Sequence, residues 1–490
     1  MSLKREILVG TAWVTGARWG IRGLGIISTL ILARLLVPDD FGIVALATMI
    51  SGAIAIFGEI GLLLHLIREP NPDRSHFDTV WTLRSLIGLV LSILIVAAGP
   101  VVALWFNDER LATIVPLLAL TSLLLGLQNP GIVWFRKNLD FRRDFIFMVA
   151  QKLAGFTVTL TLAFHFRNYW ALLCGILASS VAGLMLSYAM HPFRPRFDLS
   201  RTRAVWSFSL WILGAHLADF LAQRIDTLLI GRFRSASDVG VYTVAQDLAT
   251  SPVAELALPA ARVLFPAFSK IADDKAKLAQ IFARVFAGMA ILVFAIGPGA
   301  ALIAADAVAV LLGPNWAAAV PLIQILAASA MIYGIAQPVF PLLIALKRPN
   351  ASTYLILLQL ALLATLMIPA LMSYGLAEVA MARVAAMLVA LAATLLVFAR
   401  VAQVSARFML SSIWRPAVGA AVMVAAVLLV QGASPDMPLL RLILGAACGA
   451  AVYTFALVLL WIASGRPDTV EADLVAAARL SRLLGQTRQN

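Results

Sequence analysis

Residues 7–36 read ILVGTAWVTGARWGIRGLGIISTLILARLL. The stretch can cross a bilayer as one helix, which needs about 20 apolar residues, yet it carries Arg18, Arg22 and Arg34. An arginine at bilayer depth costs about 2.5–3.5 kcal/mol on insertion scales. Arg18 and Arg22 are four residues apart and share one helix face. Because this face is unsuited to lipid, we expect it to look into a watery cavity with a basic lining.

The composition of the whole chain is that of a membrane protein. Of its 490 residues, 62% are hydrophobic and only 13% are charged, whereas soluble domains are about 25% charged. We therefore predict an all-α polytopic protein with about 14 transmembrane helices and no large soluble domain. The predicted spans are 7–36, 41–67, 82–105, 111–128, 145–164, 170–190, 206–230, 240–267, 284–312, 317–345, 352–373, 376–399, 415–431 and 440–464.

The basic residues are distributed unequally between the two sides of the membrane. With the N-terminus in the cytoplasm, the loops and adjoining span ends on that side hold 26 Lys and Arg residues, and those on the opposite side hold 5. By the positive-inside rule this predicts an even number of spans with both termini in the cytoplasm. It also accounts for most of the net charge of +13, so we do not expect a nucleic-acid partner.

A short motif occurs twice at an offset of 198 residues. ARLLVPDDFGIVALA begins at Ala33, and GRFRSASDVGVYTVA begins at Gly231. The matched residues are Arg34 and Arg232, Asp40 and Asp238, and Gly42 and Gly240. Pro38 and the acids favour a tight turn, and the glycine favours close approach of a neighbouring helix. Each arginine either has a functional role or snorkels to the headgroups.

The repeat predicts two pseudo-symmetric six-helix lobes around a central cavity, as in transporters built from parallel repeats. We assign residues 1–203 to the first lobe, with spans 1–6, and 204–405 to the second, with spans 7–12. Residues 406–464 form two additional C-terminal helices, and 465–490 form a cytoplasmic tail with a helical stretch from about Thr469 to Leu484. Residues 268–285 are predicted to form an amphipathic helix along the membrane interface.

Charged and polar residues within the spans are the candidate functional residues. We predict that the cavity cations Arg18, Arg22, Arg224 and Arg262 bind substrate, because the planar guanidinium suits phosphate. Further cavity or coupling candidates on spans 7 and 8 are His216, Asp219, Gln223, Asp226, Asp247 and Glu255. Helical spacing places His216, Asp219, Gln223 and Asp226 on one face. The alternative is that the acids are buried partners of arginines and only hold helices together.

The sequence predicts no catalytic centre, metal site or cofactor. It contains no GxxxxGK[ST] loop and no HExxH, and its order and spacing define no Ser-His-Asp arrangement. Cys174 and Cys448 both fall in apolar spans and are interpreted as small buried residues. We therefore expect a transporter and not an enzyme.

Four segments carry a resemblance to a known family. ARLLVPDDFGIVALA, NLDFRRDF (138–145), DTLLIGRFRSASDVGVYTVAQDLA (226–249) and VLFPAFSKIADD (263–274) resemble the polysaccharide-transport branch of the multidrug/oligosaccharidyl-lipid/polysaccharide exporter superfamily. The resemblance covers most of residues 7–400. One departure is GLLLHLIREP at the end of span 2, which puts a family-like contact at His65 or Arg68 in doubt.

The resemblance implies a flippase of the bacterial inner membrane that works by alternating access. Its substrates would be undecaprenyl-pyrophosphate-linked oligosaccharide repeat units for O-antigen, capsule or exopolysaccharide. Polysaccharide polymerase and chain-length proteins are the implied partners. The alternatives are a flippase for the peptidoglycan lipid precursor and a cation-coupled drug antiporter. The arginines of span 1 argue against the antiporter, which favours acidic cavity residues.

Overall fold

The computed structural model describes residues 3–58, 62–205, 210–271, 274–402, 406–467 and 469–472, and within these ranges it contains helices and no strands. In the first half the helices are α1 (Leu3–Leu35), α2 (Pro38–Ala55), α3 (Leu62–Arg68), α4 (Arg74–Phe106), α5 (Leu111–Leu127), α6 (Val133–Lys137), α7 (Phe141–Phe166), α8 (Trp170–Met190), α9 (Thr202–Val205) and α10 (Leu210–Phe233). In the second half they are α11 (Ala236–Lys270), α12 (Lys275–Ala307), α13 (Ala319–Ala336), α14 (Val339–Ala345), α15 (Pro349–Ser373), α16 (Leu376–Ala402), α17 (Ala406–Ala433) and α18 (Pro438–Ala463).

Most of these helices are long and apolar enough to span a membrane. Among the described residues, ten meet this standard singly, and α5 with the segment Pro130–Lys137 meets it as a pair bent by 63°. The long helices α1, α10 and α11 coincide with the three remaining predicted spans. The prediction of an all-α, multi-pass membrane protein with about 14 spans is confirmed.

The second predicted span, 41–67, is broken in the structure. Helix α2 ends at Ala55, a 3-10 turn covers Ile56–Gly58, and α3 is a separate helix that starts at Leu62. Gly52 and Gly58 lower the helix propensity of this stretch, and Gly58 lies directly under the side chain of Leu91. The break leaves the end of the predicted span as a seven-residue helix.

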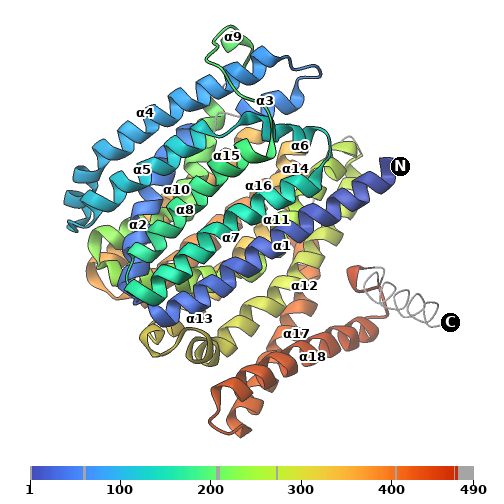
Figure 1. Cartoon of the computed structure of the whole chain (residues 1–490). Coiled ribbons are helices and arrows are strands. Elements are labelled where there is room, and N and C mark those ends of the chain that lie inside the picture. The colour runs from blue at the N-terminus through green and yellow to red at the C-terminus, as the bar shows by residue number, and fades with distance from the viewer. Residues whose placement is uncertain are drawn as a thin grey trace, which may run out of the picture. The chain divides into compact units, whose positions relative to one another are not determined.

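The chain divides into two compact units, residues 1–241 and 242–490. Within the first unit, α4 and α5 lie side by side (Figure 1). A Cβ atom added to Gly88 would lie 2.8 Å from the carbonyl oxygen of Ser122, and one added to Gly126 would lie 2.6 Å from that of Arg84. Small residues thus bring two membrane helices into backbone contact, the usual means of association in lipid. The lobe boundary at residue 203 stays a prediction.

The segment 191–199, which follows α8 and has no regular secondary structure, packs against the start of α4. The backbone N–H of Arg196 donates to Asp78 (2.8 Å), and that of Asp198 donates to Thr82 (3.0 Å). The amide of Asn129 donates to the carbonyl oxygens of His191 and Phe193. These bonds satisfy backbone groups that have no regular secondary structure of their own.

The predicted interfacial helix 268–285 is wrong. Helix α11 continues to Lys270, and α12 begins at Lys275 and runs without a break to Ala307. The apolar stripe of this segment packs inside the second unit, where Phe282 stacks on Phe398 with ring centroids 4.1 Å apart. The stripe is therefore the buried face of a long helix and not a face for lipid headgroups.

The two C-terminal helices α17 and α18 form a hairpin against α12 (Figure 1). Their buried contacts include Met423, Val427 and Tyr453, and the Tyr453 hydroxyl donates to the carbonyl oxygen of Ile291 (2.7 Å). The chain then folds back, since the Trp461 indole donates to the Pro467 carbonyl oxygen (3.1 Å). Of the predicted tail helix, Val470–Ala472 are helical and the residues beyond lie outside the described part of the chain.

Candidate functional site

The two copies of the repeated motif adopt the same local structure. The Asp40 carboxylate accepts from the backbone N–H of Val37 (3.2 Å), and the Asp238 carboxylate accepts from that of Ser235 (3.3 Å). Both acids thus cap the start of the helix that follows the turn, α2 in one case and α11 in the other. The offset of 198 residues therefore holds for geometry as well as for sequence.

The glycines of the two copies face each other across one helix crossing. A Cβ atom added to Gly42 would lie 1.7 Å from the carbonyl oxygen of Ala236, and one added to Gly240 would lie 1.8 Å from that of Pro38. The contact continues along α2, where Leu46 meets Gly231 and Gly52 meets the ring of Phe220. Helix α2 therefore runs antiparallel to the chain that passes through α10 into the start of α11.

The first motif copy is also fixed to the neighbouring loops of its unit. Asp40 accepts from the backbone N–H of Tyr169 (2.9 Å) as well as from its own turn. Arg110 forms ion pairs with Asp108 (2.7 Å) and Asp39 (2.5 Å), and hydrogen bonds to these two acids raise the pKa of Arg110. The turn is thus held by several charge-assisted bonds, which makes it a rigid structural element.

The structure separates the polar residues of α10 into two groups. His216, Asp219, Gln223 and Arg224 are exposed, and the Gln223 amide donates to Asp219 (2.8 Å). Asp226, in contrast, is fully buried. It lies on a different face of α10 from Phe220 and Gly231, the residues that contact α2. His216, Asp219 and Gln223 are therefore exposed together, whereas Asp226, predicted on the same face of α10, is not.

The arginines of the first unit have different surroundings. Arg22 is half-buried on α1, and Arg34 is exposed near the end of the same helix. Arg18 belongs to α1 as predicted, but its side chain lies outside the described part of the structure. Arg232 is exposed and its guanidinium lies 5.3 Å from the centroid of the Trp105 ring, which is a cation–π contact.

Three predicted residues belong to the part of α11 that lies in the second unit. Asp247 is exposed and Glu255 is half-buried, eight residues apart on the same helix. Arg262 lies on α11, and its side chain is outside the described part of the structure. The polar residues of α10 and of α11 thus belong to different units, 1–241 and 242–490.

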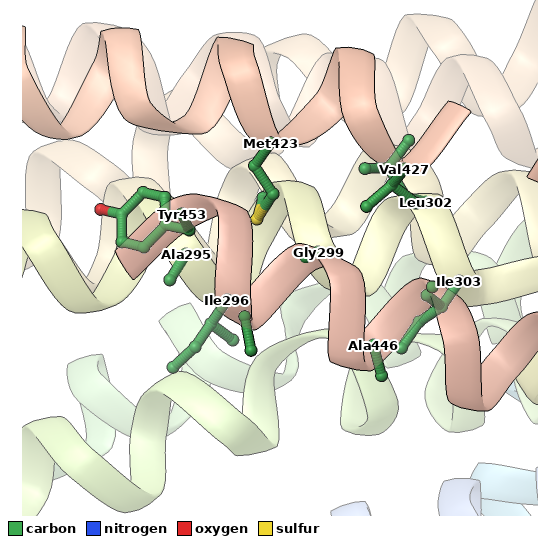
Figure 2. A pocket seen from close by; sticks show the side chains of 12 residues that line it. Ala295, Ile296, Gly299, Leu302, Ile303, Met423, Val427, Ala446 and Tyr453 are labelled. Carbon is green, nitrogen blue, oxygen red and sulfur yellow. The ribbon is translucent and has the colours of Figure 1, made fainter. Parts of the chain in front are cut away.

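The second unit contains an apolar pocket between α12 and the α17–α18 hairpin (Figure 2). Its volume is about 180 Å³, and Ile296, Leu302, Met423 and Val427 are among the residues that line it. Glycines at 299, 445 and 449 leave room along its walls. Since the Tyr453 hydroxyl is bonded to Ile291, the pocket presents hydrocarbon and suits an alkyl or isoprenoid chain.

Sequence reasoning missed a group of titratable side chains between α3 and α4. His65, Glu69 and His76 each place a ligand atom within 4.8 Å of the others. Burial and the neighbouring His76 lower the pKa of His65, against the opposing effect of Glu69. The spacing of His65 and Glu69 is visible in the sequence, but their approach to His76 depends on the turn between α3 and α4.

Comparison with known proteins gives the family. The family described as "Polysaccharide biosynthesis protein" matches residues 31–321, which includes both motif copies and the glycine crossing. The chain belongs to this family. The expected resemblance to polysaccharide transport proteins is thereby confirmed.

Two relatives align with most of this chain at low sequence identity. It is 25% identical over 360 residues to the lipopolysaccharide biosynthesis protein WzxC of Escherichia coli, an alignment that covers 72% of each chain. It is 28% identical over 331 residues to the succinoglycan biosynthesis transport protein ExoT of Rhizobium meliloti, which covers 66% of each.

Solved structures share its fold. The structure of the lipid II flippase MurJ in an inward closed conformation superimposes with a TM-score of 0.71 at 14% identity, over 92% of this chain and 99% of that one. An inward-facing multidrug resistance transporter of the MATE family superimposes with a TM-score of 0.59 at 15% identity, over 78% of this chain and 96% of that one. The chain thus has the same fold as these two proteins, as the resemblance in its sequence led us to expect.

Proposed function

We propose that this protein is a flippase that moves undecaprenyl-pyrophosphate-linked oligosaccharide units across the bacterial inner membrane. The observation that carries the proposal is the family match across both motif copies, together with relatives whose names place them in polysaccharide biosynthesis and transport. The units would serve O-antigen, capsule or exopolysaccharide synthesis. Transport is by alternating access and includes no catalytic step.

Cations in the first unit and an apolar pocket in the second unit each support a part of this proposal. Arg22 on α1 and Arg224 on α10 are cations on helices of the first unit, and a guanidinium binds pyrophosphate through paired hydrogen bonds. The pocket between α12 and the α17–α18 hairpin is lined by hydrocarbon and suits the lipid chain. We propose Arg18 and Arg262 as further phosphate ligands, and the acids of α10 and α11 as candidates for coupling.

The proposed setting is the inner membrane, with both termini in the cytoplasm. The support for the orientation is the distribution of Lys and Arg between the two sets of loops and adjoining span ends, 26 against 5. Polysaccharide polymerase and chain-length proteins are the proposed partners, since they act on the exported unit.

The test is to replace the arginines of α1 and follow the lipid-linked units. In a deletion strain, complete units should accumulate on the cytoplasmic leaflet and the wild-type gene should clear them. Arg18→Ala and Arg22→Ala should each lower surface polymer about tenfold or more, because one charge-assisted hydrogen bond contributes about 1.5–3 kcal/mol. Arg142→Ala, which removes an exposed arginine in the first turn of α7, is the matched control.

The location of the accumulated units distinguishes the outcomes. Accumulation on the periplasmic leaflet would contradict the flippase function and move the defect to polymerisation. Normal polymer in the double Arg18→Ala/Arg22→Ala variant would contradict substrate binding by these arginines but not the flippase function. Lethality of the deletion would favour a flippase for the peptidoglycan precursor, whose fold this chain shares.

A further inference from the structure

A cluster of metal-ligating side chains lies between α3 and α4, away from the arginines and polar residues considered above. It consists of His65 on α3, Glu69 just after α3, and His76 in the first turn of α4. The ligand atoms of the three side chains all lie within 4.8 Å of one another. Two imidazoles and a carboxylate are the donor set of three-ligand zinc sites.

Local backbone structure brings the first two ligands together. The backbone N–H of Glu69 donates to the carbonyl oxygen of His65 (2.9 Å), so the helical turn continues through Glu69. Residues four apart in a helix lie on the same face. The Lys137 ammonium donates to the carbonyl oxygens of Leu66 and Glu69, which holds this turn in place.

The third ligand is oriented by the start of α4. Asp73 caps this helix by accepting from the backbone N–H of His76 (3.1 Å), and the same oxygen lies 2.6 Å from Nδ1 of the His76 ring. The other Asp73 oxygen pairs with Arg201 (3.1 Å). A carboxylate on one imidazole nitrogen leaves the other nitrogen, Nε2, as the metal ligand, which is the usual outer arrangement of a metal-bound histidine.

The His65 ring provides the observation that points to a ligand. It stacks on the His76 ring with centroids 5.9 Å apart and an angle of 24° between planes. Its Nε2 atom is buried, and among the described residues no hydrogen-bond partner reaches it. A buried polar atom without a partner costs about 1–3 kcal/mol, and coordination of a cation would satisfy it.

We propose that His65, Glu69 and His76 bind one divalent transition-metal ion, with Zn²⁺ as the preferred ion and water as a fourth ligand. Two imidazole nitrogens and one carboxylate suit Zn²⁺, whereas Mg²⁺ and Ca²⁺ prefer sites made of oxygen alone. The ion would fasten the short helix α3 to the first turn of α4. The site is independent of the proposed transport function.

The test measures metal binding by the purified full-length protein in detergent, after chelation and without a histidine tag. Co²⁺ serves as the spectroscopic probe and Zn²⁺ as its competitor. The wild type should bind one Co²⁺ per chain with the intense visible absorption of a four- or five-coordinate site, and Zn²⁺ should displace it. Glu69→Gln should weaken binding at least tenfold, and His65→Ala/His76→Ala should abolish it.

Two further variants separate coordination from folding. Asp73→Asn keeps all three ligands and should weaken binding about 10–100-fold, as loss of an outer carboxylate does. His165→Ala removes an exposed histidine at the end of α7 and should bind as the wild type does. Zn²⁺ should also raise the unfolding temperature of the wild type and not of the double variant, because a ligand stabilises the state that binds it.

Either of two results would overturn the proposal. One is a wild type that binds no Co²⁺ or Zn²⁺ at one equivalent, a measurement that does not depend on any variant. The other is wild-type affinity in the double variant His65→Ala/His76→Ala.

Discussion

At the scale of single residues, Gly42 and Gly240 are two positions where the backbone of a neighbouring segment leaves no room for a side chain. Each meets a backbone carbonyl oxygen of the other motif copy, at 1.7 and 1.8 Å from an added Cβ atom. Backbone atoms cannot turn aside as a flexible side chain can, so a methyl group forces the helices apart. Forced overpacking of this kind costs about 1–3 kcal/mol.

We therefore expect Gly42→Ala to lower the thermal stability and the membrane abundance of the protein. The measurement is the unfolding temperature of the detergent-purified variant together with its amount in membranes. Gly432→Ala is the matched control, because an added Cβ atom there meets nothing within 4 Å. Equal unfolding temperatures for the two variants would refute the importance of the crossing.

Prediction from sequence succeeded for residues whose environment is local. The turn at Pro38 and the close approach of a helix at Gly42 follow from residue type, and the structure contains both. The burial of Asp226 depends on how other helices pack on α10, and the environment of His76 depends on the turn between α3 and α4. Such long-range contacts leave no trace in helical periodicity.

At the scale of elements, the buried ion pair between Arg415 on α17 and Glu471 beyond α18 connects the chain's last described residues to the hairpin. The side chains are 3.1 Å apart and each is 9% exposed. Removal of one partner from a buried pair leaves an uncompensated charge and costs about 3–5 kcal/mol, whereas apolar replacement of both is often neutral.

Glu471→Gln should therefore release the segment 464–472 and destabilise the second unit, while Arg415→Met/Glu471→Leu should restore most of the loss. Amide hydrogen exchange of this segment measures the release, and thermal unfolding measures the destabilisation. Glu109→Gln changes an exposed acid and should alter neither. A double variant that exchanges as fast as the single variant would show that the pair itself does not fasten the segment.

The failure of the predicted interfacial helix is also explained at this scale. An apolar stripe on a helix faces either lipid headgroups or a protein core, and periodicity is the same in both cases. Leu278, Phe282 and Phe286 face a core in the second unit. The sequence therefore predicts the spacing of the apolar residues but not which surface they pack against.

At the scale of the whole molecule, the asymmetry of basic residues predicts which side of the membrane each loop occupies. In a background with Cys174 and Cys448 replaced by alanine, Ser200→Cys should react with a permeant reagent only, and Glu109→Cys should also react with an impermeant one added from the periplasm. Both positions are exposed in the structure. The reverse pattern would invert the proposed orientation, and labelling of both from outside would remove one span from the count.

The fold was predictable at this scale because composition and span length are global properties. Hydrophobic runs give the number of spans, and a motif repeated at 198 residues indicates an internal duplication. The binding residues could not be predicted from the sequence. Arg22, Arg224 and the acids of α11 would have the same helical spacing whether they bind substrate or hold helices together. Contacts, and in the end measurements, decide between these roles.

The facing glycines restrict how this protein can be recombined with its relatives. Each copy of the motif supplies the carbonyl oxygen that excludes a side chain from the other copy. A chimaera that takes the first motif from one parent and the second from another must therefore inherit glycine at both places, with the same spacing from the turn. Positions 42 and 240 must therefore be exchanged together, although 198 residues separate them.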